Sequence, residues 1–203
     1  MSTLRLLQEQ TPPDALNQQD DAALMLLVAT GQTDAFAVLV ARHEPALGRF
    51  LSRMVGVAEA DDLCQESFVE LWRRRTEYQE LGKFRPLLYR IARNKALSHL
   101  RWRAVRLRHA RQRLVADADA ATERHSDTGL DRVLRQERDA ALTREVLRLP
   151  YKQREAVVLH YAESFDFASM AAITGVAEGT LRVRAHRGLA RLREAFAARG
   201  GLP

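Results

Sequence analysis

Apolar residues recur at intervals of three and four positions through most of this 203-residue chain, and this spacing is typical of helices with one buried side. Leu181, Ala185 and Leu189, for example, would lie along one side of a single helix. Glycine and proline are few, and the alternating pattern of strands is scarce. We therefore expect an all-α fold of two small helical domains joined by a flexible linker.

Changes in composition predict where the domains begin and end. Residues 1–20 contain a Thr-Pro-Pro sequence and several glutamines, and we expect a flexible tail there. Helical spacing runs through residues 21–108, fades in residues 109–130, and returns in residues 131–199. The larger part of the middle segment is rich in Ala and Asp, so we interpret it as the linker between the two domains.

The ends of several helices in the first domain can be predicted from single residues. Gly31 and Gly56 are expected to end the first two helices, and Pro45 is expected to kink the second. Asp61 is the expected N-cap of the third helix. Pro86 suits the first turn of a long fourth helix.

The uneven distribution of charge indicates the class of partner. The net charge is +6 at pH 7, and the segment from Lys83 to Arg113 holds eleven Lys or Arg residues and no Asp or Glu. Acidic residues gather instead in residues 61–70 and in the linker. This pattern favours a nucleic-acid partner over an anionic membrane surface, while a merely basic protein stays an open alternative.

Residues 167–187, FASMAAITGVAEGTLRVRAHR, have the layout of a helix-turn-helix of the winged-helix-like DNA-binding type. Gly175 permits the positive φ of a tight turn, and a second helix begins near Glu178. Basic residues and a valine lie on the side of that helix away from its apolar stripe and on one flank of the stripe: Arg182, Val183, Arg184, His186 and Arg187. Guanidinium groups bind phosphates or guanine edges, so the pattern predicts a recognition helix. A solvated helix surface is the alternative.

Residues 83–108, KFRPLLYRIARNKALSHLRWRAVRLR, interleave cations with aromatic side chains. Cations attract phosphates whatever the base sequence, and Phe84, Tyr89 and Trp102 could stack on unpaired bases. Phe84 and Tyr89 could equally belong to the buried side of the helix. The amide of Asn94 lies among basic neighbours and could read a base edge.

Five segments, taken in order, resemble the motifs of one bacterial family: DAFAVLVARHEPAL, EADDLCQESFVELWRR, FRPLLYRIARNKALSHLR, LRLPYKQREAVVLHY and GTLRVRAHRGLARLREAF. Together they make residues 21–197 similar to the extracytoplasmic-function (ECF) RNA polymerase sigma factors of the sigma-70 family. Such a protein binds core RNA polymerase and directs promoter-specific initiation of transcription. The resemblance implies sigma region 2 in residues 21–108 and sigma region 4 in residues 131–199.

The resemblance also implies roles for individual residues. Region 2 would dock on the clamp helices of the largest polymerase subunit through one acidic face: Asp62, Leu63, Gln65 and Glu66. Its long helix would melt and read the −10 promoter element. The amide of Asn94 would hold a flipped-out base, and three cations would bind the DNA strand: Arg90, Arg93 and Lys95. Region 4 would read the −35 element through Arg182, Val183, Arg184, His186 and Arg187.

Two departures from the family pattern concern the −10 preference. Pro86 stands where the family commonly has tryptophan, and Ser98 stands where it often has an acidic residue. The −10 sequence that this chain prefers therefore stays open.

Other classes of function find less support. The six histidines are scattered without metal-ligand spacing and Cys64 lies on an apolar stripe, so we expect no catalytic site, metal or cofactor. A single cysteine and the absence of a recognisable signal peptide or membrane span favour the cytoplasm. A stand-alone helix-turn-helix regulator would explain the second domain but would leave the first without a role. Whether an anti-sigma factor sequesters the protein stays open.

Overall fold

The computed structural model describes residues 13–78, 83–113 and 140–198, and these ranges contain helices and short turns but no strand. The expected all-α fold is therefore confirmed. The elements are α1 (Pro13–Asn17), α2 (Asp21–Ala29), α3 (Thr33–Val55), α4 (Val57–Arg73), the 3₁₀ turn η2 (Arg75–Glu77), α5 (Phe84–Arg113), α7 (Tyr151–Val157), the π-helical turn η3 (Val158–Ala162), α8 (Phe167–Thr174) and α9 (Glu178–Ala197). Residues 140–148 are also helical.

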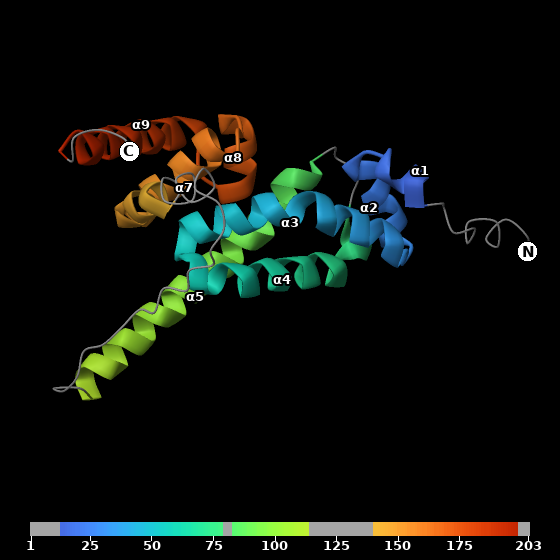
Figure 1. The fold of residues 1–203 in the computed structure, drawn as a ribbon, viewed down its shortest axis with the longest axis horizontal. Helices are drawn as coiled ribbons and strands as arrows, with labels where there is room; N and C mark the ends of the chain where they lie inside the picture. Colours follow the sequence, from blue (N-terminus) through green and yellow to red (C-terminus); the bar gives the residue numbers. More distant parts are fainter. Residues whose placement is uncertain (1–12, 79–82, 114–139, 199–203) are drawn as a thin grey trace, which may run out of the picture.

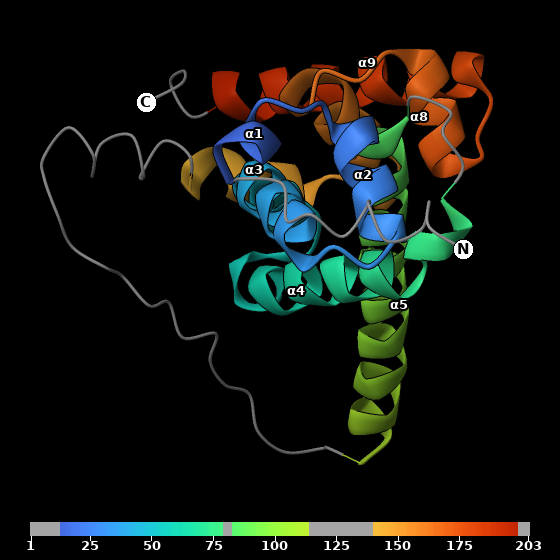
Figure 2. The ribbon, with the colours of Figure 1, turned by 90° about the vertical axis from the view of Figure 1, so that its right-hand side faces the viewer.

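The first domain is built on the long helix α3. In Figures 1 and 2, α3 and α4 run side by side, and α5 packs against both before its second half extends away from the rest of the molecule. The space between these helices is filled by apolar side chains with no exposed surface, such as Leu39, Phe50, Met54 and Leu88. Burial of each such side chain contributes about 1.5–3 kcal/mol to the free energy of unfolding.

Two glycines set the helix ends in this domain, as expected. Gly31 follows α2 with a φ of 97°, and Gly56 joins α3 to α4 with a φ of 106°. The expectation for Asp61 is wrong: α4 begins at Val57, so Asp61 lies inside it. Gly56 changes the chain direction within one residue, and the next helix needs no separate cap further along. Helix α3 continues through Pro45.

The predicted limits of the tail and linker also need correction. Residues 13–17 form α1, and the side chain of Leu16 is only 1% exposed because it packs into the core. The ordered fold thus begins within the predicted tail, of which residues 1–12 lie outside the described residues. Helix α5 continues to Arg113, so residues 109–113 are helical, while residues 114–130 of the predicted linker lie outside the described residues.

The second domain contains the expected helix-turn-helix. The carboxylate of Asp166 accepts a hydrogen bond from the backbone N–H of Ser169 at 2.7 Å and caps α8. Gly175 ends α8 in the left-handed conformation with a φ of 71°, and α9 begins at Glu178. Helix α9 buries Leu181, Ala185, Gly188 and Leu192 against α7 and α8. The local signals in the sequence therefore placed both helices and the turn.

The helices before the turn are joined at Leu149-Pro150, as the sequence indicated. Val157 and Val158 are buried, but the expectation that Tyr161 packs in the core is wrong because its side chain is 52% exposed. The π-helical turn η3 rotates the chain between Val158 and Ala162, so that spacing based on 3.6 residues per turn no longer identifies the buried side.

The two domains pack directly against each other, which the sequence did not indicate. The turn η3 lies against α3, and α8 lies against α5. The rings of Tyr89 in α5 and Phe165, before α8, are 4.9 Å apart at their centroids. Both side chains are buried, so the apolar cores of the two domains are continuous.

Candidate polymerase and nucleic-acid interfaces

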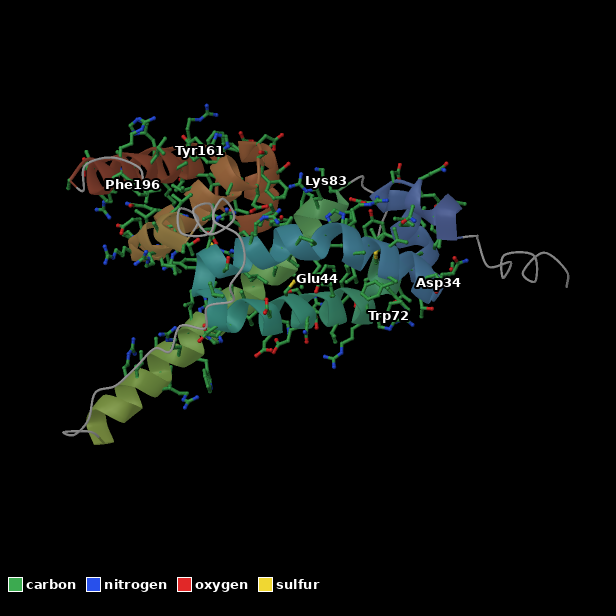
Figure 3. The ribbon with its side chains drawn as sticks, in the orientation of Figure 1. Asp34, Glu44, Trp72, Lys83, Tyr161 and Phe196 are labelled. Carbon is green, nitrogen blue, oxygen red and sulfur yellow. The ribbon has the colours of Figure 1, made fainter. Side chains whose placement is uncertain are left out.

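Helix α9 presents a basic surface away from its buried stripe. Arg182, His186 and Arg187 are exposed, and Val183 is 48% exposed, whereas Arg184 is half-buried. The guanidinium of Arg182 lies 4.7 Å from the ring centroid of Phe167, a contact that orients this side chain at the start of the helix. Figure 3 shows nitrogen-tipped side chains along the outer edge of α9. The five residues predicted from the sequence thus lie on one helix, four of them on its open surface.

On α5, Arg90 and Asn94 are four residues apart on one side of the helix, and both are exposed. Arg90 lines a cavity of about 370 Å³ together with Lys83, Leu87 and Ala172 of α8. This cavity is therefore bounded by both domains. Asn94 faces a different groove, between α5 and α4.

The other two predicted strand-binding cations of α5 are engaged with carboxylates. The Nε of Arg93 donates to Oε1 of Glu155 at 2.7 Å, and its Nη1 donates to the Asn94 side-chain oxygen at 3.2 Å. The Nζ of Lys95 lies 3.2 Å from Oε2 of Glu66. Both cations must therefore leave these partners before they can bind a phosphate.

The aromatic residues of the α5 segment divide into two groups. Phe84 and Tyr89 are 3% and 1% exposed, so the alternative that they belong to the buried side of the helix is correct. Trp102 is 54% exposed, and the guanidinium of Arg106 lies 4.5 Å from its ring centroid. Among these three aromatic residues, only Trp102 offers its ring to a partner in this conformation.

Three of the four docking residues predicted on α4 are exposed to solvent. Asp62, Gln65 and Glu66 are exposed, but Leu63 is only 6% exposed and packs in the core. Leu63 also lines the groove between α4 and α5, and its docking contact stays a prediction. Val69, which follows Gln65 by one helical turn, is 49% exposed and was not among the residues predicted from the sequence. Its position on the same side as Gln65 and Glu66 is the signal that could have found it.

A groove of about 510 Å³ between α4 and α5 brings the predicted docking and strand-binding residues together. Glu66 of α4 and Asn94, Lys95 and Trp102 of α5 all line it. The polar face of α4 and the basic face of α5 are therefore two walls of one surface feature.

Neither a metal centre nor a reactive thiol is found in the described part of the chain. No cluster of His, Cys, Asp and Glu among the side chains that the structure describes has the geometry to hold a metal ion. Burial raises the pKa of the Cys64 thiol to about 11, so the thiol is protonated at neutral pH. No helix among the described residues is long and apolar enough to cross a membrane.

Comparison with known proteins places both domains in one family. Residues 39–106 match the family model for sigma-70 region 2, and residues 139–192 match the model for sigma-70 region 4. The chain is 40% identical over 166 residues to the RNA polymerase sigma factor CarQ of Myxococcus xanthus, a match that covers 81% of this chain and 90% of CarQ. This chain belongs to the ECF group of the sigma-70 family.

Further comparisons agree with this assignment. The ECF RNA polymerase sigma factor SigW of Bacillus subtilis is 30% identical to this sigma factor over 178 residues, covering 82% of this chain and 91% of SigW. The solved structure of CnrH in complex with the cytosolic domain of CnrY has a TM-score of 0.65 and 25% identity, and covers 88% of this chain and 97% of that chain. As a sigma factor, the protein binds core RNA polymerase and promoter DNA and directs promoter-specific initiation of transcription.

Proposed function

We propose that three surfaces of this sigma factor divide the work of initiation, and that the open face of α9 recognises the −35 element. The observation that carries this proposal is the position of that face, which projects from the helix that follows a left-handed turn at Gly175. A helix in this position can enter the major groove of DNA. Arg182, Val183, Arg184, His186 and Arg187 are then the residues that contact the element, with half-buried Arg184 the most restricted in its reach.

Helix α5 is proposed to bind and read the −10 element. Asn94 is exposed beside a groove, where its amide can both donate to and accept from the edge of an unstacked base. Arg90 is exposed at the mouth of the interdomain cavity and can hold the phosphate backbone at once. Arg93 and Lys95 join it after they exchange Glu155 and Glu66 for phosphates.

Helix α4 is proposed to dock on the clamp helices of the largest polymerase subunit. Asp62, Gln65 and Glu66 supply exposed polar contacts on one side of the helix. We assign the apolar contact to Leu63 and add Val69, because an exposed side chain can be buried on docking without disturbing the core. The groove between α4 and α5 then places the polymerase beside the melted strand.

The remaining assignments follow from the family. We propose region 2 in residues 21–108 and region 4 in residues 131–199, with α1 added to the first domain because Leu16 packs there. We further propose that the protein has no catalytic activity of its own, acts in the cytoplasm, and is held inactive by an anti-sigma factor. The last point is supported by a solved structure of similar fold, that of the sigma factor RpoE in complex with the anti-sigma factor NepR from Bartonella quintana.

DNA binding with and without core polymerase tests the proposal against its rival. A stand-alone helix-turn-helix regulator binds its site without polymerase, whereas a sigma factor of this kind should retain promoter DNA specifically only as holoenzyme. In a gel-shift selection from random duplexes, we expect specific sequences to be enriched with core polymerase present and not without it. Equal enrichment under both conditions would favour the regulator.

A further inference from the structure

We propose that the free sigma factor is held in a closed form by an interdomain latch, in which Glu155 and Glu163 of the second domain bind Arg93, Tyr89 and Arg53 of the first. In this arrangement the carboxylate of Glu155 occupies the position at Arg93 that a promoter phosphate takes in the open form. Only the expected change in DNA affinity rests on the proposed strand-binding role of Arg93; the closed form itself does not.

The first half of the latch is centred on Glu155. This residue is 1% exposed, and its Oε1 accepts hydrogen bonds from Nε of Arg93 at 2.7 Å and from the hydroxyl of Tyr151 at 3.1 Å. Burial raises the pKa of the Tyr151 hydroxyl, so it remains protonated and keeps donating. A buried carboxylate is retained only where such partners compensate its lost hydration, so Glu155 depends on Arg93.

The second half is centred on Glu163. Its Oε2 accepts a hydrogen bond from the hydroxyl of Tyr89 at 2.6 Å, and its Oε1 lies 3.6 Å from Nη1 of Arg53. The backbone carbonyl of Glu163 also accepts from Nη2 of Arg85 at 3.0 Å. Glu163 is 7% exposed and its hydrogen bond with Tyr89 is buried, whereas the hydrogen bond from Arg85 is partly buried.

Backbone and aromatic contacts complete the closed form. The Nη1 of Arg154 donates to the carbonyl of Met54 at 2.7 Å, and the guanidinium of Arg85 lies 4.7 Å from the ring centroid of Phe165. These contacts tie α7 to α3, and the segment before α8 to α5. The two domains are thus held by charged and polar groups together with a continuous apolar core that includes Tyr89 and Phe165.

The closed form is incompatible with simultaneous reading of both promoter elements. The −35 and −10 elements are separate sites on the promoter, and each base pair between them adds about 3.4 Å along a straight duplex. Domains in direct contact cannot span the DNA between the two elements. The 26 residues between Arg113 and residue 140 allow a separation of up to about 90 Å when fully extended, so the chain is long enough to open.

The charged contacts of the interface are the part that can exchange partners. Separation of the domains exposes the apolar surface around Tyr89 and Phe165 at a free-energy cost, whereas the separated carboxylates and guanidinium groups regain their hydration. A phosphate, like a carboxylate, offers two oxygens to the guanidinium of Arg93. Promoter DNA therefore competes directly with Glu155 for Arg93.

The test measures the distance between the domains in the full-length free protein. Spin labels are attached to cysteines that replace Ala58 in α4 and Arg191 in α9, both exposed, while buried Cys64 stays unlabelled because its thiol is protonated. We expect one narrow, short distance in the wild type and a long, broad distribution after Glu155→Gln with Glu163→Gln. Glu70→Gln is the control, because Glu70 pairs with Arg74 of the same helix segment at 2.6 Å.

A second readout is affinity for single-stranded DNA without polymerase, with random-sequence oligonucleotides as the probe. If the open form is about a tenth of the wild-type population, release of the latch raises the apparent affinity about tenfold. A long, broad distance distribution in the free wild type would overturn the proposal without reference to any variant. Wild-type distances and affinity in a normally folded double variant would also overturn it. These distances involve neither polymerase nor promoter, so they are independent of the proposed function.

Discussion

Replacement of Gly188 by alanine should destabilise the second domain, whereas the same change at Gly48 should stabilise the protein. Gly188 lies on the buried side of α9, where an added Cβ would sit 2.5 Å from Cγ2 of Val157 and 3.2 Å from the backbone oxygen of Gln153. Carbon atoms in contact prefer about 3.5–4.0 Å, so α9 must move away from α7 by about 1 Å. No atom lies within 4 Å of a Cβ built on Gly48, in the middle of α3.

The expected magnitudes follow from two opposing effects. Overpacking of a core costs about 1–3 kcal/mol, while alanine in place of glycine inside a helix gains about 1 kcal/mol. The net change in the free energy of unfolding is then a loss of about 1 kcal/mol for Gly188→Ala and a gain of about 1 kcal/mol for Gly48→Ala. For a chain of this size, each corresponds to a shift in Tm of about 2–4 °C.

Thermal unfolding followed by circular dichroism measures both changes. The expected result is a lowered Tm for Gly188→Ala and a raised Tm for Gly48→Ala. Since the displaced helix is the proposed recognition helix, Gly188→Ala should also weaken binding of the holoenzyme to promoters that depend on the −35 element. Equal increases in Tm for the two variants would refute the close packing of α9 on α7.

Three further predictions concern the proposed contacts. Asp62→Lys combined with Glu66→Lys should abolish co-purification with core polymerase while leaving the circular dichroism spectrum unchanged; retention on core in a pull-down would reject the docking role of α4. Asn94→Ala should leave polymerase binding intact and lower open-complex formation about ten- to hundredfold, because a lost base contact is worth about 1–3 kcal/mol; permanganate reactivity of unpaired thymines equal to that of the wild type would argue against it. Arg187→Ala should reduce transcription from −35 variants far more than Arg193→Ala. If Arg187 contacts a base, the variant should lose the preference at one base pair; if it contacts phosphate, the slope of log binding constant against log salt concentration should fall by about one. Identical activity of both variants would show that the outer side of α9 is only a solvated helix surface.

The parts of the fold predicted from sequence are those fixed by neighbouring residues. Gly175 allowed the helix-turn-helix to be placed because a glycine between two segments of helical apolar spacing is typical of a left-handed turn. Gly56 marked the end of α3 for the same reason. The prediction that Asp61 is the N-cap was wrong because a carboxylate is favourable within the first turns of a helix as well as at the cap position. Helix α4 begins four residues earlier, directly after Gly56.

The parts that could not be predicted depend on contacts far apart in the chain. Glu155 and Glu163 bind residues 62 and 74 positions earlier, and no local pattern distinguishes them from surface acids. From the sequence, Phe84 and Tyr89 could not be assigned to the core or to base stacking, because an aromatic side chain suits either environment. Leu63 stood at the border between the buried and open sides of α4, and only the packing of α5 decided its place.

In-vitro transcription with purified core polymerase tests the proposed division of work between the two domains most directly. The sigma factor is added to core on a library of random promoters, and the transcribed templates are sequenced and probed for unpaired bases. We expect a set of templates that share two elements at a fixed spacing, with melting at the start-proximal element only when the sigma factor is present. Transcription without sequence selection would contradict the proposed division of work. So would a complete lack of transcription from templates that core polymerase and this protein bind together.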